Sequence, residues 1–348
     1  MTVVMGIESS CDETGVGLVR DGHLLGQALA SSMAEHVRFG GVVPEIAARA
    51  HLHAIVPTIK AALADAGLAL DDVGAIAVTA GPGLVTALHV GVSAAKSLSL
   101  SMGVPLFGVH HLAGHAAADT LDHGPLPQRC IVLIVSGGHT SLLLVEDLVR
   151  TPILHLSDTM DDAAGEAFDK VARLLGLPYP GGPSIDRTAR SGDPDSVRLP
   201  RPLMRASDPP LGFSFSGLKT AVARHLAANP DRSPQAVADV AASFQEAVAD
   251  VLTAKAIRAC RSNNIDTLVV VGGVAANSRV RALAEQRCAS AGIHLRVPRM
   301  SLCTDNGAMI AAVGDLLVRA SATASPLSIA VESSVPLSTA QLALDRLG

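Results

Sequence analysis

Aromatic residues are scarce in this chain of 348 residues: they make up 2% of the sequence, and tryptophan is absent. Hydrophobic residues nevertheless account for 49% and charged residues for 17%, which is the composition of a globular protein. The core must therefore be packed from aliphatic side chains. With so few aromatic rings, base stacking cannot be the main means of recognising a nucleic acid.

Cysteine is also sparse and shows no pattern. The five cysteines form no C-x-x-C pair and are scattered over the chain, at Cys11, Cys130, Cys260, Cys288 and Cys303. Neither a disulfide framework nor a cysteine zinc site is predicted. No apolar stretch is long enough to cross a bilayer, and no targeting segment precedes the first strand-like run. We expect a cytoplasmic protein that contacts no membrane.

Positive charge is in deficit, since the formal net charge is −5, and this disfavours tight binding of a polyanion by the chain as a whole. Residues 187–224 are an exception and are about four charges positive. Their cations are Arg187, Arg190, Arg198, Arg201, Arg205, Lys219 and Arg224, against Asp193, Asp195 and Asp208. A solvated loop is the simpler interpretation, and a local contact with RNA is the alternative.

Two patterns occur twice in the same order. An apolar strand at residues 3–8, a polar turn and a return strand at 16–19 are matched about 127 residues later by residues 130–135, 136–140 and 141–145. A strand at residues 75–80 that leads into glycines and a helix is matched by residues 267–271, Gly272 and Gly273, and a helix at 278–287. A duplicated chain accounts for both repeats better than chance does.

We therefore predict an α/β protein with two lobes whose polar turns clamp phosphates across a central cleft. This plan resembles the actin-like ATPase (ribonuclease H-like) fold. The expected divisions are residues 1–129 for the first lobe, 130–320 for the second lobe with an inserted helical and loop segment, and 321–348 for a loosely attached tail.

The sharpest local pattern is a histidine pair. His111 and His115 are four residues apart, so on a helix both imidazoles project from one face and could share a metal ion. An isolated H-x-x-x-H is a weak signal among 13 histidines and needs a third ligand. Asp305 is the candidate, although an aspartate just before a helix could instead be its N-cap. His51 and His53 would diverge on a helix and are not expected to be ligands.

A second cluster of acidic residues leads into a helix. Asp162, Glu166 and Asp169 are spaced to share one helical face, and a solvated face is the simpler interpretation. Beyond them, the glycines at 181 and 182 would allow a ligand to approach the backbone. Asp186 follows and could accept hydrogen bonds from ribose hydroxyls.

Taken together, these segments resemble the bacterial branch of the tRNA N6-adenosine threonylcarbamoyltransferase family over roughly residues 3 to 315. The matching motifs lie at residues 6–14, 40–45, 110–115, 135–140, 161–170, 179–183, 213–220, 272–277 and 303–307. Departures are mild: Ser9, Phe39, Ala48 and Ala275 replace threonine, tyrosine, serine and serine. None of these positions is a proposed metal ligand.

The resemblance implies an acyltransferase. It would move the threonylcarbamoyl group from threonylcarbamoyl-AMP to N6 of the adenosine immediately 3′ of the anticodon, in tRNAs that read codons beginning with A. It also implies one divalent metal, Fe²⁺ or else Zn²⁺, held by His111, His115 and Asp305. A paralogous actin-like protein and a small ATPase would be its partners.

The resemblance further assigns substrate contacts by matching motifs. The phosphate and carbamoyl region would contact Ile134, Val135, Ser136, Gly137 and Gly138. The nucleoside would be held by Asp169, Gly182, Asp186 and Asn277. The residues do not identify a general base, for which His139 and Asp12 are candidates.

Three other functions compete with this one. A zincin metalloprotease is disfavoured because its H-E-x-x-H helix needs a glutamate where this chain has Leu112. A small-molecule kinase of the same fold remains an alternative, since fold does not fix function. A non-catalytic scaffold related to the partner protein would have no need of the intact metal ligands.

Overall fold

The computed structural model describes residues 2–39 and 41–342. Gly40, in the 40–45 motif, and the last six residues of the expected tail lie outside the described residues. The chain divides into two compact units that interleave in sequence. Unit 1 comprises Met1–Gln128, Val145–Leu154 and Thr304–Gly348, and unit 2 comprises Arg129–Leu144 and His155–Cys303. The division expected from sequence was simpler, because it did not return residues 304–320 to the first unit.

Unit 1 is built on a five-stranded sheet. Its strands are β1 (Val3–Glu8), β2 (Glu13–Arg20), β3 (His23–Ser31), β4 (Val73–Gly81) and β5 (Leu106–His110), in the order β3-β2-β1-β4-β5. The hairpin strands pair antiparallel, with Gly6 opposite Gly17, whereas β4 and β5 run parallel to β1. The hairpin expected from residues 3–8 and 16–19 and the strand expected at residues 75–80 are confirmed.

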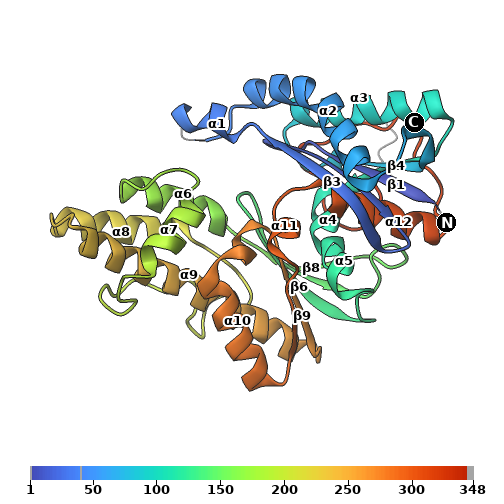
Figure 1. Cartoon of the computed structure of the whole chain (residues 1–348). Coiled ribbons are helices and arrows are strands. Elements are labelled where there is room, and N and C mark those ends of the chain that lie inside the picture. Colours follow the sequence, from blue (N-terminus) through green and yellow to red (C-terminus); the bar gives the residue numbers. More distant parts are fainter. Residues whose placement is uncertain (1, 40, 343–348) are drawn as a thin grey trace. The chain divides into compact units, whose positions relative to one another are not determined.

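Helices cover both faces of this sheet. α2 (Pro44–Ala66) and α3 (Val85–Met102) lie on one face, and α4 (His111–Ala118) and α12 (Gly307–Arg319) lie on the other (Figure 1). The shorter elements of unit 1 are α1 (Met33–His36), η1 (Val37–Phe39), η2 (Leu70–Asp72) and α5 (Thr120–His123). The core is aliphatic, as the composition required.

Unit 2 repeats the plan of unit 1. Its strands are β6 (Cys130–Val135), β7 (Thr140–Val145), β8 (Leu154–Asp158), β9 (Thr267–Val271) and β10 (His294–Arg296). They follow the order β8-β7-β6-β9-β10, in which each strand occupies the place of its counterpart in unit 1. β9 and β10 are parallel to β6, as β4 and β5 are to β1. The predicted duplication is therefore confirmed.

The helices of unit 2 pack around one long helix. α9 (Pro234–Ser262) contacts α7 (Gly181–Ala189), α8 (Ser216–Ala228) and α10 (Ser278–Ala291), and it also contacts β6 and β9. α6 (Ala164–Leu174) packs against α7 and α8 (Figure 1). η3 (Gly273–Ala276) precedes α10, and α11 (Met300–Cys303) ends the unit.

The expectation of a loosely attached tail from residue 321 is wrong for the residues that are described. Ile329, Leu337 and Leu342 are buried in unit 1. The amides of Ser325 and Leu342 donate to the carbonyls of Leu106 and Gly108 in β5. The segment is thus fixed to unit 1 both by buried apolar side chains and by backbone hydrogen bonds.

Two further findings concern membranes and cysteines. In the described part of the chain, no helix combines the length and the apolar character needed to cross a membrane. All five cysteines are free, and four of them are buried.

Candidate functional sites

Close packing of α12 on the hairpin sets the position of Asp305. A Cβ on Gly6 would lie 2.1 Å from the amide nitrogen of Ala311, and a Cβ on Gly17 would lie 2.4 Å from that of Ala308. Only glycine allows the helix backbone to approach the strands this closely. Gly114 of α4 faces side chains of α12, since its Cβ would lie 2.7 Å from Ile310 Cδ1. The start of α12 is thereby brought to α4.

The structure brings the three predicted metal ligands together. Asp305 Oδ1 lies 3.6 Å from His111 Nε2 and 3.2 Å from His115 Nε2. Both histidines are buried, and the side chain of Asp305 is 23% exposed. One ligand atom from each residue lies within 4.8 Å of the others, and the group could hold a metal ion.

The N-cap alternative for Asp305 is not what the structure shows. Asn306 is the N-cap of α12, and its Oδ1 accepts a hydrogen bond from the amide of Met309 at 2.9 Å. The capping role therefore belongs to the next residue. Asp305 is left to face the histidines.

Glu8 orients the first histidine, and sequence reasoning did not single it out. Its Oε2 lies 3.1 Å from His111 Nδ1 and accepts a hydrogen bond from Thr79 Oγ1 at 2.6 Å. Burial alone would raise the pKa of Glu8, but His111 beside it outweighs this and holds the pKa below its usual range. Burial alone would lower the pKa of His111, but Asp305 and Glu8 raise it to about 9. A lone carboxylate at the end of an apolar strand was the signal that could have identified Glu8.

This cluster has the features of a metal centre. Two ligand atoms each about 2.1 Å from an ion lie about 3 to 3.5 Å apart at normal coordination angles, close to the two distances from Asp305. His115 is fully buried, and neither of its ring nitrogens has a hydrogen-bond partner among the described residues. Two imidazoles and one carboxylate leave coordination positions open for substrate or water. The residues present fit a divalent ion.

The neighbouring residues of the first turn form a separate network. His51 is fixed between Thr14 Oγ1, 2.7 Å away, and the Cys11 carbonyl, 3.0 Å away, and burial lowers its pKa. Both of its ring nitrogens therefore have partners within the chain. Asp12 is half-buried, and burial raises the pKa of its carboxyl group, which suits a residue that accepts a proton.

In unit 2, the turn between β6 and β7 offers backbone donors. Ile134 and Val135 are fully buried in β6, so only their backbone could reach a ligand. The turn is closed by Ser136, whose amide donates to the His139 carbonyl at 2.8 Å and whose Oγ accepts from the His139 amide at 3.1 Å. A Cβ on Gly137 or Gly138 would meet no described atom within 4 Å. An open glycine turn of this kind can bind an anion.

Asp169 and Gly182 lie where α6 and α7 meet. Asp169 Oδ1 accepts a hydrogen bond from the amide of Gly181 at 2.7 Å, which fixes the start of α7. Gly181 is in close contact with the backbone of α6, whereas Gly182 faces open space. Both glycines thus belong to the first turn of α7. Gly182 remains accessible to a ligand.

Asn277 and Asp186 are braced by other residues of unit 2. Asn277 caps α10 by accepting the amides of Arg279 and Val280 through Oδ1, and its Nδ2 donates to Gln245 Oε1 at 2.8 Å. Asp186 Oδ1 accepts a hydrogen bond from Ser278 Oγ at 2.6 Å. Gln245 was not identified from sequence, because a buried glutamine within a helix carries no distinctive pattern.

The acidic cluster before α6 is only partly helical. Asp162 precedes the helix, which begins at Ala164, so it is not in register with Glu166 and Asp169. Lys170 pairs with Asp162 at 2.7 Å and with Glu166 at 2.9 Å. Asp162 and Glu166 therefore belong to a local ion-pair network, and only Asp169 braces the candidate site.

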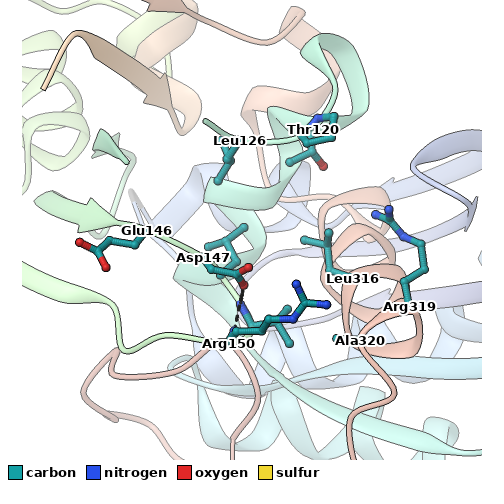
Figure 2. A pocket seen from close by; sticks show the side chains of 11 residues that line it. Thr120, Leu126, Glu146, Asp147, Arg150, Leu316, Arg319 and Ala320 are labelled. Carbon is teal, nitrogen blue, oxygen red and sulfur yellow. Dashed lines mark hydrogen bonds between the residues drawn. The ribbon is translucent and has the colours of Figure 1, made fainter. Parts of the chain in front are cut away.

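A pocket of about 200 Å³ lies elsewhere in unit 1, between α12 and the loop of residues 146–150 (Figure 2). Asp147 Oδ1 accepts hydrogen bonds from the amides of Val149 and Arg150, both at 2.8 Å. The Arg150 side chain extends toward α12 at Leu316 (Figure 2). The described residues that line the pocket include none of the site residues predicted from sequence.

The chain matches known proteins both in sequence and in fold. Residues 23–312 match the model of the family described as tRNA N6-adenosine threonylcarbamoyltransferase. The structure is similar to HypF from T. kodakarensis (TM-score 0.60, 14% identity, 93% of this chain and 48% of that chain). It is also similar to the activator of 2-hydroxyisocaproyl-CoA dehydratase from Clostridium difficile (TM-score 0.53, 15% identity, 93% of this chain and all of that one).

A third structure is YeaZ from Pseudomonas aeruginosa, with a TM-score of 0.31, 20% identity, and coverage of 42% of this chain and 60% of that chain. That score is too low to carry an argument. The chain spans about half of the HypF chain and 60% of the YeaZ chain. At these identities the HypF and activator structures show the fold alone, which is the predicted actin-like ATPase fold.

Proposed function

The chain belongs to the tRNA N6-adenosine threonylcarbamoyltransferase family, and we propose that it acts on one adenosine with threonylcarbamoyl-AMP as donor. Membership makes it a transferase that modifies tRNA. The proposal adds that the acceptor is N6 of the adenosine immediately 3′ of the anticodon, in tRNAs reading codons that begin with A. AMP is the second product.

One observation carries the proposal: the family match spans residues 23–312 and thus includes every proposed metal ligand and substrate contact. The geometry supports it, because Asp305 lies beside His111 and His115 in unit 1, although it is distant from them in sequence. In unit 2, the proposed substrate contacts lie at an open glycine turn and at braced helix starts.

The reaction has one difficult feature. The lone pair of the exocyclic adenine amine is delocalised into the ring, so the amine is a poor nucleophile. It attacks the carbamoyl carbon of the mixed anhydride, the bond from that carbon to the phosphate oxygen breaks, and N6 loses a proton. The chain must hold the two substrates together and stabilise developing negative charge.

The residues divide this work. A divalent ion held by His111, His115 and Asp305, which we propose to be Fe²⁺ with Zn²⁺ as the alternative, would act as a Lewis acid. The amides of Gly137 and Gly138 would donate to phosphate or carbamoyl oxygens. Asp169 fixes the start of α7 and so keeps Gly182 open to the nucleoside. Asn277 and Asp186 would contact the same nucleoside.

Two residues remain candidates for the proton acceptor. The raised pKa of Asp12 brings its carboxyl group nearer to neutral pH, where a general base works best. His139 is half-buried in the glycine turn, beside the proposed contacts to the phosphate. Separate substitutions, Asp12→Asn and His139→Asn, would distinguish the two by the pH dependence of transfer.

We also propose that the enzyme works in the cytoplasm with a paralogous actin-like protein and a small ATPase. Leu52 and Val56 of α2 and Leu100 of α3 are large apolar residues, 63%, 55% and 71% exposed. Leu52 and Val56 are one helical turn apart, on a common face. Exposed apolar side chains of this kind suit a protein interface.

Reconstitution tests the proposed function. Purified protein with its partners, unmodified tRNA and threonylcarbamoyl-AMP should yield modified adenosine and AMP, measured by mass spectrometry of digested tRNA. His111→Ala should lower the rate by at least about 10²-fold, the loss typical of one preorganised electrophilic contact. His53→Ala is the matched control, because His53 is exposed and is not a proposed ligand.

Two outcomes would favour a rival. If the wild-type protein modifies no adenosine but phosphorylates a small hydroxyl or carboxylate compound, it is a kinase of this fold. If it does neither, while the paralogue carries the transfer activity, it is a scaffold.

A further inference from the structure

Charge is unequally divided between the two units. Unit 1 contains 8 lysine and arginine residues against 17 aspartate and glutamate residues, a formal charge of −9. Unit 2 contains 19 against 15, a formal charge of +4. A polyanion is therefore repelled by unit 1 and attracted by unit 2. The phosphate backbone of a tRNA substrate should contact unit 2.

Within unit 2, residues 191–210 form an irregular segment, here called the strap, that is held along the length of α9. At its start, Gln235 Nε2 donates to the Ser191 carbonyl at 3.1 Å, and Asp239 Oδ1 accepts from the Asp193 amide at 2.9 Å. Gly192 allows this contact, because a Cβ there would lie 2.0 Å from the carbonyl oxygen of Ala238.

The same helix holds the rest of the strap. Ser243 Oγ accepts a hydrogen bond from the amide of Val197 at 3.1 Å. Lys255 Nζ donates to the Leu203 carbonyl at 2.8 Å, and Arg258 donates to the Pro210 carbonyl at 3.1 Å. From Gln235 to Arg258 the helix rises about 35 Å. The proline-rich segment is thus a fixed strap along α9.

The three arginines of the strap differ in whether they form ion pairs within the chain. Arg201 is bound to Asp250, with its Nε 3.1 Å from Oδ2, and serves the fold. Arg198 and Arg205 are exposed and form no ion pair with any described residue. The amide of Arg205 donates to Asp208 Oδ2, which fixes its backbone and leaves the guanidinium in solvent.

We propose that the strap is a tRNA-docking surface, on which Arg198 and Arg205 contact phosphates of the RNA backbone. Guanidinium groups bind phosphate bidentately, and a backbone already fixed by α9 loses little entropy on binding. The anchors nearest to the two arginines, Ser243 and Lys255, are about 18 Å apart along the helix, so we expect the two contacts to fall on separate phosphates. This inference rests on the proposed function for the identity of the RNA.

Direct binding of unmodified tRNA to the full-length chain tests the strap. The double variant Arg198→Gln/Arg205→Gln should weaken binding about tenfold at low salt. The slope of log affinity against log salt concentration should fall by about 1 to 2, because each phosphate contact contributes about 0.7 to 0.9. Arg198→Lys/Arg205→Lys keeps the charge and should restore the slope.

The matched control also removes two positive charges, but from unit 1. Arg20→Gln/Lys60→Gln changes exposed cations and should leave affinity and slope close to wild type. Equal weakening by both pairs would show a net-charge effect, and unchanged binding by the strap variant would show a solvated loop. Either result overturns the proposal. Transfer by the wild-type enzyme tests the function separately, so the two failures can be distinguished.

Discussion

At the scale of single residues, Glu8 positions one of the three candidate metal ligands. Its carboxylate faces His111 Nδ1, so that nitrogen carries the proton and Nε2 is directed toward Asp305. Outer partners of this kind set the tautomer and ring position of a metal-binding histidine. Thr79 in turn fixes Glu8 through a short hydrogen bond.

Replacing Glu8 by glutamine should therefore weaken metal binding without removing a ligand. An amide is a poorer acceptor for the imidazole N–H, and loss of such a partner costs about 10–100-fold in affinity. Titration of the purified variant against a competing chelator measures the change. Glu45→Gln is the control, since Glu45 pairs with Arg49 on the surface of α2. Wild-type affinity in the Glu8 variant would show that His111 is oriented without it.

At this scale the sequence identified the candidate ligands, which the structure brings together, but not the residues that support them. The spacing of His111 and His115 and the glycine turn at 137–138 are local patterns, and local patterns can be seen in a chain. The contacts of Glu8 with His111 and of Gln245 with Asn277 join residues 103 and 32 positions apart. No spacing rule predicts such pairs, because only the fold brings them together.

At the scale of elements, the fit of α12 against the β1–β2 hairpin is the central contact. Gly6 and Gly17 are opposite each other in the hairpin, and both admit the helix backbone. The helix carries Asp305 just before its first turn. Any change that lifts α12 from the hairpin should therefore displace Asp305 from the candidate metal site as well.

Gly6→Ala is expected to destabilise unit 1 and lower metal occupancy together. The added methyl group would overlap the backbone of α12, and overpacking of this kind costs about 1–3 kcal/mol or more. Chemical denaturation and metal analysis of the same sample measure both effects. Gly217→Ala is the matched control, because a Cβ there meets no described atom within 4 Å. Full stability in Gly6→Ala would show that α12 can shift at little cost.

Strands were more predictable than irregular segments. The apolar runs at residues 3–8 and 130–135 became β1 and β6 with the expected bounds, because a short continuous apolar run bounded by turn residues marks a buried strand locally. The end of the chain was misjudged because its buried residues, such as Ile329 and Leu342, are too far apart to form a period. Its attachment depends on backbone hydrogen bonds, which leave no mark on side-chain composition.

For the whole molecule, the repeat in the sequence predicted the repeat in the fold. Both sheets have the same strand order, which follows from two copies of one hairpin and one strand–glycine–helix unit. The interleaving of the units was not predicted. Residues 304–342 return to unit 1 through contacts with strands about 200 or more positions earlier, and such contacts have no local signature.

Metal removal should affect the two units differently. All three proposed ligands belong to unit 1, so binding stabilises that unit by mass action. Treatment with a chelator should speed amide hydrogen exchange in α4 and α12 and leave β6 and α9 unchanged. Mass spectrometry of peptides from the exchanged protein measures this. An equal increase in both units would contradict a metal effect confined to unit 1.

The glycines of the first hairpin have a consequence for the history of the duplicated chain. At the repeat distance of 127 residues, Gly6, Gly15 and Gly17 correspond to Leu133, Leu142 and Leu144, which are buried in the core of unit 2. In unit 1 these positions allow the backbone of α12 to approach the hairpin, whereas in unit 2 they supply large side chains to the core. If the hairpins were exchanged, leucine side chains would push α12 away from the sheet of unit 1. Glycines would leave cavities in the core of unit 2. The two halves have diverged into parts that no longer substitute for each other, so a recombination event that restored their identity would destroy both.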